Sequence, residues 1–477
     1  MNRNNIWIHL CIAVVLVTMA AVWGQIRRWQ SMRTADTTSE RVIKTTPKPI
    51  ATKRSDSEKE PEVLVKFRPG VTVADIKKIT EKNNDRLEDE IETVKGLVSI
   101  DDLDNADARK VADQYAAMTD LVVYAEPNFE IKLDDPANVS APTNDDYNVP
   151  LDTTLPNDPM FNEQWALHNT GQNGGKENAH VDALKAWDKT KGSDKIVVAV
   201  LDTGVDFTHA DLMTNIWFRP DNIPQYTDDE LGTFNDEHGF NATDNIADPM
   251  DDNGHGTHCA GIIGAEGNND EGIAGINWNV RIMPLKFLGR GGFGSTKDAI
   301  EAINYAIDRK QKGVNVRIIS ASWGSTQYSK ALEDAIRAAG EAGILFVAAA
   351  GNDGSSNDKR PHYPSNYDLP NVVSVAALDR SDQLASFSNF GVKTVHIAAP
   401  GKEILSTWLN DQYREASGTS MATPYVSGAA GLVLAAEPNL TVAKLRERLL
   451  KSVDKLDNLS DKVQSGGRLN AAKALGN

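Results

Sequence analysis

The chain has 477 residues, which is long enough for several domains and a large buried core. Its net charge of −17 and its pI of about 5.0 argue against nucleic acid as a partner. Cys11 and Cys259 are its two cysteines, so a framework of disulfides is excluded and the fold must depend on its core and on any bound metal.

The first residues contain an apolar run at positions 6–24. The length of this run fits a cleaved signal peptide and an uncleaved membrane anchor equally. More arginines follow the run than precede it, and that bias alone would keep the rest of the chain on the cytoplasmic side. We assign residues 1–29 to a signal peptide or signal anchor. Residues 30–60 are rich in Thr, Ser, Lys and Pro without periodicity, which predicts a disordered linker.

Residues 61–133 have the pattern of a small α+β domain. Strand-like runs alternate with segments that have one apolar helical face, and a further strand is needed before Gly96. The order β-α-β-β-α-β predicts a ferredoxin-like plait. The expected elements are strands at 63–67, 97–100 and 121–125 and helices at 72–83 and 105–118.

Residues 134–155 form the next segment, which carries several Pro, Asp and Asn residues and no apolar face. We expect an exposed linker suited to cleavage, and the mature protein to begin between Asp134 and Pro156.

From residue 156 to residue 477, buried strands alternate with helices. This predicts an α/β domain of three layers, in which a parallel sheet is covered by helices on both faces. Asp202 and Asn352 directly follow two of the strands, at the edge where such sheets bind ligands. The expected strands are residues 196–201, 282–288, 317–322, 344–349, 372–376 and 395–398.

Ser420 lies in the segment Gly-Thr-Ser-Met-Ala-Thr-Pro at 418–424, where a helix of small residues begins. A hydroxyl at a helix N-terminus lies beside unpaired backbone N–H groups, which favour an anion forming on an attacked carbonyl. Serine needs a base and a carboxylate that orients the base. His255, which follows an acidic loop, is the candidate base, and Asp202 at the end of a buried strand is the candidate carboxylate.

Three segments together carry a family resemblance. Asp-Thr-Gly at 202–204, His-Gly-Thr-His at 255–258 and the Ser420 segment, in that order, resemble the signatures of the subtilisin-like serine proteases, and the thermitase branch in particular. The likeness runs from about residue 155 to residue 475. It implies a serine endopeptidase that cleaves protein or peptide substrates through an acyl-enzyme.

The resemblance also implies how the chain is made. It identifies residues 61–133 as a prodomain that assists folding and then inhibits its own catalytic domain, residues 156–477, until the precursor processes itself. A protease made with its inhibitor is expected to be exported, so we set aside the arginine bias and predict a protein that is secreted or anchored outside the cytoplasmic membrane through residues 6–24.

The resemblance assigns an oxyanion donor and a substrate groove. Asn352, in Ala-Ala-Gly-Asn, is the donor, although such an asparagine could also belong to a simple turn. Asp353 either lines the pocket for the substrate residue that precedes the scissile bond or points to solvent. The groove would pair with a peptide as an added strand. The residues carried over for it are Ser322, Trp323, Gly324, Gly289, Gly291 and Gly292.

The glycine-rich segment 289–294 also fits G-x-G-x-x-G after a strand, so a dinucleotide site is an alternative. We reject it because no acidic residue ends the next strand at the required distance.

Metal binding has two readings. His255, His258 and Cys259 could suggest zinc, but three ligands on one element without a distant fourth fit it poorly. The resemblance instead implies structural Ca²⁺, since carboxylates and carbonyls from three segments would converge; a solvated acidic loop is the alternative. Side chains of Asp158, Asp211 and Asn269 and carbonyls of Glu266, Glu271 and Ile273 are the ligands carried over. A weaker site is considered around Asp244, Asp248 and Asp252.

Two other functions are weighed. A catalytically idle member of the family would act as a binding module, but it should lack one of Asp202, His255, Asn352 and Ser420, and all are present. A dedicated processing protease would need a more acidic pocket and a downstream β-domain. The segment 213–240 is longer than the family pattern requires, and we expect a surface insertion near the cleft.

Overall fold

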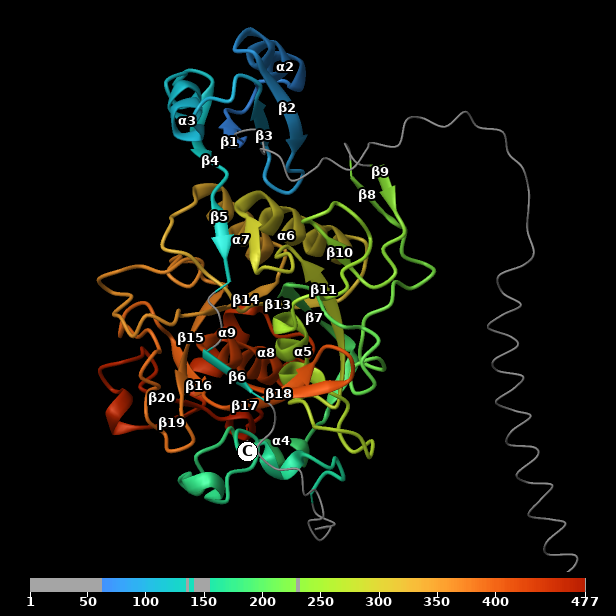
Figure 1. Ribbon diagram of the computed structural model, residues 1–477, viewed down its shortest axis with the longest axis vertical. Helices are drawn as coiled ribbons and strands as arrows, with labels where there is room; N and C mark the ends of the chain where they lie inside the picture. Colours follow the sequence, from blue (N-terminus) through green and yellow to red (C-terminus); the bar gives the residue numbers. More distant parts are fainter. Residues whose placement is uncertain (1–61, 134–136, 141–154, 229–231, 477) are drawn as a thin grey trace, which may run out of the picture. The chain divides into compact units, whose positions relative to one another are not determined.

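The computed structural model describes residues 62–133, 137–140, 155–228 and 232–476 (Figure 1). The predictions for residues 1–29 and 30–60 lie outside these ranges, as does most of 134–155. Within the described ranges, no helix is both long enough and apolar enough to span a membrane. Residues 60–477 form one compact unit, so contacts within it can be followed.

Residues 62–127 form the predicted plait, which we call the N-terminal plait. Its four strands are antiparallel in the order β2-β3-β1-β4, and two helices cover the sheet. Val63, Ile100 and Tyr115 are buried between the layers. The elements are β1 (Glu62–Phe67), α2 (Val73–Lys82), β2 (Asp85–Glu90), β3 (Leu97–Asp102), α3 (Ala108–Ala116) and β4 (Val122–Pro127).

Residues 155–476 form the large domain, whose centre is a nine-stranded sheet. Every neighbouring pair is parallel except the pair at the β19 edge. In sheet order the strands are β10 (Phe240–Asn241), β11 (Asn279–Lys286), β7 (Gly192–Asp202), β13 (Val316–Ala321), β14 (Leu345–Ala349), β15 (Val372–Leu378), β16 (Ile397–Pro400), β20 (Gly467–Leu469) and β19 (Val453–Lys455).

The sheet is covered on both faces, as predicted for a parallel sheet with continuous apolar strands. Along β7, Val198 and Val200 belong to the core that contains α5 and α8, whereas Val197 and Ala199 belong to the core that contains α6 and α7. The alternation arises because successive strand side chains point to opposite faces. The helices are α4 (Ala183–Trp187), α5 (His255–Gly264), α6 (Thr296–Gln311), α7 (Lys330–Glu341), α8 (Thr419–Ala436), α9 (Val442–Lys451) and α10 (Ala471–Ala474).

Three small sheets complete the described structure. Two of them join segments just after the plait to the large domain: β5 (Glu130–Lys132) pairs with β12 (Phe293–Ser295), and β6 (Ala137–Ser140) extends the hairpin of β17 (Ile404–Trp408) and β18 (Gln412–Ser417). The third is the hairpin β8 (Tyr226–Asp228) and β9 (Gly232–Phe234) within residues 213–240.

The segment 213–240 is fixed to α6 by a buried ion pair. Arg309 and Asp236 are both buried, and their Nη1 and Oδ2 atoms lie 3.0 Å apart. The Tyr305 hydroxyl donates to the same carboxylate at 2.8 Å. Tyr226 belongs to the core beneath α6. The insertion therefore packs on the α6 layer, and its closeness to the cleft stays a prediction.

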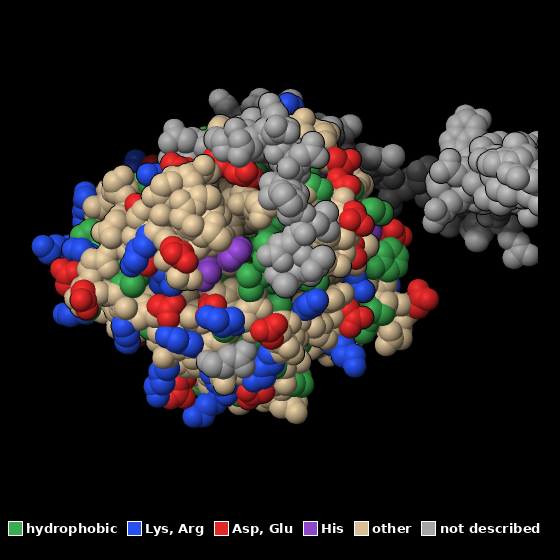
Figure 2. Space-filling view, turned by 90° about the horizontal axis from the view of Figure 1, so that it is seen from below, with side chains coloured by type: hydrophobic (Ala, Val, Ile, Leu, Met, Phe, Trp, Pro, Cys, Tyr) green, Lys and Arg blue, Asp and Glu red, His purple; other side chains and the backbone are tan. Residues whose placement is uncertain are grey.

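The molecular surface carries charges of both signs. On the face seen in Figure 2, acidic and basic side chains are interspersed, and neither sign forms a continuous block there.

Candidate active site

Asp202 and His255 form a buried hydrogen-bonded pair at the carboxyl edge of the sheet. Asp202 ends β7 and His255 begins α5, and the His255 Nδ1 atom lies 2.7 Å from the Asp202 Oδ1 atom. Neither side chain is exposed to solvent. Such a carboxylate fixes the ring orientation of a histidine and stabilises its protonated form.

Asp251, which the sequence analysis did not single out, holds the loop before His255 in place. Its Oδ1 accepts hydrogen bonds from Thr203 Oγ1 at 2.9 Å and from the Gly254 N–H at 3.0 Å. Its Oδ2 accepts from Thr257 Oγ1 at 2.6 Å. Burial raises the pKa of this carboxyl group, and the hydrogen bonds oppose that rise. Asp251 thus ties the segment after Asp202 to the start of α5; the acidic pair before Asn-Gly-His was its only signal.

Close backbone approach is also required here. A Cβ atom added at Gly256 would lie 2.0 Å from the carbonyl oxygen of Gly204. Any larger residue at 256 would therefore push α5 away from the turn that follows Asp202, and would separate His255 from its carboxylate.

Ser420 lies in the first turn of α8 and is buried. Its Oγ donates to the carbonyl of Ser322 at 2.9 Å, and Ser322 Oγ donates to the carbonyl of Ser420 at 2.8 Å. This reciprocal pair connects the start of α8 to the end of β13. It places the hydroxyl of Ser420 at the same sheet edge as Asp202.

Pro424 explains why the Ser420 carbonyl needs partners from outside α8. In an α-helix that carbonyl would accept the N–H of the residue four positions later, but proline has no N–H. The carbonyl accepts from Ser322 Oγ instead, and Cys259 Sγ lies 3.5 Å away as a second donor.

Cys259 also links the two halves of the site. Its sulfur lies within 4.8 Å of the ligand atoms of Asp202 and His255, and it contacts the backbone of Ser420. Burial raises the pKa of the Cys259 thiol well above its ordinary value, so the thiol stays protonated.

Asn352 lies beside the N-terminus of α8. Its side-chain oxygen accepts from the N–H of Thr419 at 2.9 Å and from the Thr419 hydroxyl at 3.0 Å. Its amide nitrogen is buried and has no hydrogen-bond partner among the described residues. The two hydrogen bonds thereby orient the Asn352 side chain and leave its amide N–H groups available as donors. Asp353, the next residue, is exposed.

The glycine-rich segment predicted for substrate binding pairs with the chain itself. β12 and β5 are antiparallel, with Gly294 opposite Ile131, and the N–H of Leu133 donates to the carbonyl of Gly292 at 2.7 Å. Gly289 closes the turn through its N–H to the carbonyl of Phe293 at 2.8 Å. Gly291 lies within this turn. The segment therefore pairs with an extended strand of the same chain, and its binding of a substrate stays a prediction.

The second predicted groove segment is more deeply buried. Ser322 contacts Ser420 as described above, while Trp323 is buried against Phe287 and donates its indole N–H to the carbonyl of Leu201. The Trp323 side chain thus packs beside the carboxyl ends of β7 and β11. A Cβ at Gly324 would lie 2.0 Å from the His362 ring, so this position admits only glycine.

β6 adds a strand to another small sheet of the large domain. It pairs antiparallel with β18, with Ala137 opposite Ser417 and Ser140 opposite Glu415. Ser417 precedes Ser420 by only three positions, so β6 pairs with the strand that leads into α8; both elements are labelled in Figure 1.

The side chains predicted to bind calcium come together at the other end of α5. Asp211 is fully buried and Asp158 nearly so. Asp211 Oδ1 accepts from Asn269 Nδ2 at 2.9 Å, and Asp158 accepts from the N–H of Asn268. Burial raises the pKa of Asp211 to about 7 and that of Asp158 to about 6. The partners described for these carboxylates are backbone N–H groups, Asn269 and Tyr413, not cationic side chains.

The backbone of this loop is tightly turned. Asn268 and Asp270 have φ values of 64° and 62°, and the N–H of Ile273 donates to Asp211 Oδ2 at 2.9 Å. Glu266 accepts a side-chain hydrogen bond from Thr214, and the N–H of Glu271 donates to Asn269. The loop that carries Glu266, Glu271 and Ile273 therefore folds around Asp211.

The weaker calcium site and the zinc site considered from the sequence involve residues with other partners. Asp252 forms an ion pair with buried Lys286 at 2.6 Å, which engages one member of the weaker set considered around Asp244 and Asp248. His258 lies within hydrogen-bond distance of two carbonyls, and burial lowers its pKa to about 3, so it is a neutral imidazole packed in the fold.

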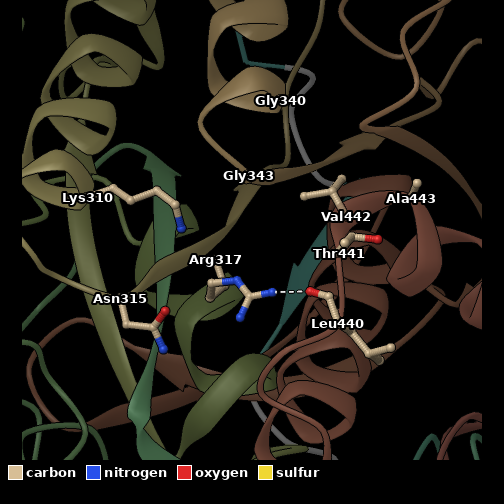
Figure 3. Close-up of a pocket in the computed structure, with 9 residues that line it drawn as sticks. All are labelled: Lys310, Asn315, Arg317, Gly340, Gly343, Leu440, Thr441, Val442 and Ala443. Atoms are coloured by element: carbon tan, nitrogen blue, oxygen red, sulfur yellow. Dashed lines mark hydrogen bonds between the residues drawn. The ribbon is translucent and has the colours of Figure 1, made fainter.

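A hollow of about 490 Å³ lies at the opposite edge of the sheet (Figure 3). Arg317 and Lys310 line it, but both already donate to backbone carbonyls, Arg317 to Pro438 and Leu440 and Lys310 to Val316. It lies beside the residues that precede β13 and β14, where the strands begin. It is therefore separate from the edge that carries Asp202 and Asn352.

Comparison with known proteins agrees with this geometry. Residues 193–470 match the model of the subtilase family. The chain is 38% identical over 319 residues to a thermophilic serine proteinase from Bacillus sp. (strain AK1), covering 66% of this chain and 71% of that protein. It is 35% identical over 320 residues to thermitase from Thermoactinomyces vulgaris, covering 67% of this chain and 99% of that protein.

A solved structure extends the match beyond the large domain. Fervidolysin from Fervidobacterium pennivorans, described as a keratinolytic enzyme related to subtilisin, superposes with a TM-score of 0.67 at 25% identity. The match covers 89% of this chain and 62% of fervidolysin.

Proposed function

Since the chain belongs to the subtilase family and is a serine-type endopeptidase, we propose that Ser420 attacks the peptide carbonyl, His255 takes the hydroxyl proton and Asp202 orients the imidazole. The observation that carries this assignment is the buried pair of Asp202 and His255, 2.7 Å apart, which Cys259 links to the first turn of α8, where Ser420 lies. These residues lie at the edge of the sheet where ligands bind, which supports the proposal.

The reaction proceeds through an acyl-enzyme. The carbonyl carbon of the substrate bonds to Ser420 Oγ, and the proton passes to His255, which then gives it to the leaving amine. In the second half His255 takes a proton from water as the water oxygen bonds to the carbonyl carbon of the ester. The bond between that carbon and Ser420 Oγ then breaks, His255 returns the proton to Ser420 Oγ, and the acid product leaves.

Asn352 and the backbone N–H of Ser420 are the proposed donors to the oxyanion. A donor that is fixed beforehand stabilises the charge without reorganisation in the transition state. The support is the unpartnered amide nitrogen of Asn352 together with the two hydrogen bonds that hold its oxygen.

The N-terminal plait is proposed to be a prodomain whose tail occupies the enzyme's own groove. β5 and β6 pair with the large domain as a bound peptide would, by adding strands. Because β5 ends at Lys132 and β6 begins at Ala137, and both strands pair with the large domain, we propose that processing cuts a bond between Leu133 and Ala137. This interval is narrower than the one between Asp134 and Pro156 that the sequence alone gave for the start of the mature protein.

Glu126 supports a role of the plait in folding. Its carboxylate, at the end of the plait, accepts from the N–H groups of Lys330 and Ala331 at 2.8 Å and 3.0 Å. These groups are the unpaired donors of the first turn of α7, and a negative charge there is favoured by the helix dipole. The plait thus completes a helix of the large domain, which suits a folding assistant.

Calcium is proposed as a structural ion held by Asp158, Asp211, Asn269 and the loop carbonyls of Glu266, Glu271 and Ile273. The donor set fits, since it offers oxygen atoms from three segments and buries two carboxylates without a cationic partner. Bound there, the ion would neutralise those carboxylates and cross-link the segments.

Export is the proposed location. An apolar run at residues 6–24 precedes the plait, and an enzyme held inactive by its own segment can cross a membrane before it is released. Secretion and anchoring on the outer side both fit this arrangement.

The Ser420→Ala chain tests the proposal when it is produced in a protease-deficient host. We expect an uncleaved precursor, whereas the wild-type chain should yield a mature protein whose N-terminus lies between residues 134 and 137. Ser427→Ala, which removes another buried hydroxyl of α8, is the matched control and should still mature. Maturation of the Ser420→Ala chain would show that Ser420 is not the nucleophile of processing.

A further inference from the structure

Three buried carboxylates from three distant parts of the chain converge where the N-terminal plait meets the large domain. Asp89 comes from β2, Asp228 from the β8 hairpin of the 213–240 insertion and Glu301 from α6, and these elements are labelled in Figure 1. Their exposed fractions are 7%, 3% and 5%. One carboxylate oxygen of each lies within 4.8 Å of the others.

The neighbouring lysine, Lys297, already forms ion pairs with other carboxylates. Lys297, one turn before Glu301 on α6, lies 2.9 Å from Glu88 and 3.7 Å from Glu62. Glu62, Glu88 and Asp101 form a second carboxylate group beside the first. Arg86 pairs with Asp101 of that second group. Together Lys297 and Arg86 carry fewer charges than the six carboxylates, and repulsion at these separations is strong in a buried setting.

The pKa values reflect this excess of negative charge. Burial, and then the nearby Asp89, raise the pKa of Glu301 well above its ordinary value, and burial raises the pKa of Asp89. Two carboxyl groups in this situation must hold either a proton or a cation.

A second observation points to a ligand. Glu301 Oε1 is buried and has no hydrogen-bond partner among the described residues. A buried carboxyl oxygen without a partner is costly, and a bound cation would satisfy it.

The spacing suits a hard divalent cation. Calcium binds oxygen ligands at about 2.3–2.6 Å, so two oxygens on one ion are at most about 5 Å apart. The three oxygens here lie inside that limit. A shared proton would join only two of the carboxylates and would leave the third charged.

We propose that Asp89, Asp228 and Glu301 form a divalent-cation site, suited to Ca²⁺, that fastens the N-terminal plait to the insertion and to α6. The site needs a ligand from the plait, so it belongs to the precursor and weakens when the plait departs. This consequence rests on the proposed removal of residues 61–133.

The insertion is placed well for this purpose. The buried pair of Asp236 and Arg309 fixes it to α6, the helix that also carries Glu301. Two ligands are therefore held rigidly by the large domain, and the plait supplies the third. The proposed site gives the insertion a function that the sequence did not reveal.

The test uses the full-length Ser420→Ala chain, so that the plait stays attached. Ca²⁺ is the probe, and equilibrium dialysis at neutral pH counts the ions bound per chain. We expect Asp228→Asn and Glu301→Gln each to bind one ion fewer than the parent, and the parent to bind one ion more than the mature enzyme. Glu62→Gln, which removes one charge from the neighbouring group, is the matched control and should bind as many ions as the parent.

Two outcomes would overturn the site. Equal stoichiometry in the parent, Asp228→Asn and Glu301→Gln chains would mean that the carboxylates hold a proton instead. Loss of an ion in Glu62→Gln as well would place the ion elsewhere. Intact mass, recorded on every sample, reports separately on the proposed function, because cleavage of the Ser420→Ala chain would count against the nucleophile and not against the cation site.

Discussion

The side-chain oxygen of Asn352 accepts a hydrogen bond from the backbone N–H of Thr419 at 2.9 Å. Thr419 directly precedes Ser420, so the bond ties the end of the β14 turn to the residue beside the proposed nucleophile. It also decides which end of the amide is available, since the oxygen is used and the nitrogen is not. The amide nitrogen is consequently ready to donate to a charge that develops next to Ser420.

Asn352→Asp should separate the effect of the amide oxygen from the effect of the amide nitrogen. The aspartate keeps an oxygen for Thr419, but it replaces the donor with a second acceptor. We expect kcat to fall by about 10²–10³, the range found for loss of one oxyanion donor in subtilisin, with little change in Tm. Steady-state kinetics and thermal unfolding of the purified mature enzyme measure both. Turnover near the wild-type value would remove Asn352 from the mechanism.

Chelation should destabilise the mature enzyme if Asp158, Asp211 and Asn269 hold calcium. An ion that binds only the folded state stabilises it by about 2.7 kcal/mol when its free concentration is about 100 times its dissociation constant. We expect EDTA to lower the Tm and to speed autolysis, and Asp211→Ala to have a low Tm with or without EDTA.

The control for calcium is Asp194→Ala, which removes an exposed carboxylate on β7. Its Tm should respond to EDTA as the wild type does. Identical melting curves of the wild-type enzyme with and without EDTA would contradict a structural ion at Asp211.

Much of the large domain could be predicted from local patterns. The continuous apolar run at 196–201 forms β7, buried on both faces, and the other five predicted strands are found with ends shifted by a few residues. The residues of the candidate site could be proposed because each lies in a short local motif. Asp202, for example, stands where β7 ends and a turn begins.

Long-range contacts could not be found in this way. Asp89, Asp228 and Glu301 are far apart in the sequence, and each looks like an ordinary surface acid until the fold brings them together. Asp251 was missed for a related reason, because its function lies in contacts with Thr203 and Thr257 and not in a motif. The place of the insertion depends on the buried pair with Arg309, which no periodicity indicates.

Acid should unfold the protein partly through His396. This imidazole is buried, and its Nδ1 accepts from the N–H of Ser374 at 2.8 Å, which requires the neutral ring. Burial, and then the charge of Arg446, lower its pKa from 6.5 to about 3. A lowered pKa in the folded state means that the unfolded state binds the proton first. The contribution to stability is therefore complete above pH 6.5 and is lost as the pH falls towards 3.

His396→Asn tests this titration, since the amide oxygen can accept from Ser374 without titrating. The free energy of unfolding of the Ser420→Ala chain should fall with decreasing pH between 6 and 4. The slope in His396→Asn should be smaller by about 1.4 kcal/mol per pH unit. Denaturant titrations at several pH values give both slopes. Parallel pH dependences would show that His396 does not carry this effect.

Cys259 should be a point of inhibition without taking part in the chemistry. Its thiol is buried between the Asp202–His255 pair and the backbone of Ser420, and its raised pKa keeps it from acting as a nucleophile. A mercurial that reaches this sulfur should displace His255 from Ser420 and stop turnover, because base and nucleophile must stay within hydrogen-bond reach. Cys259→Ala and Cys259→Val should keep most of the activity and become insensitive to the reagent, as measured by peptide hydrolysis before and after treatment of the mature enzyme. If either variant folded normally but had no activity, Cys259 would have a chemical function that its buried, protonated state argues against.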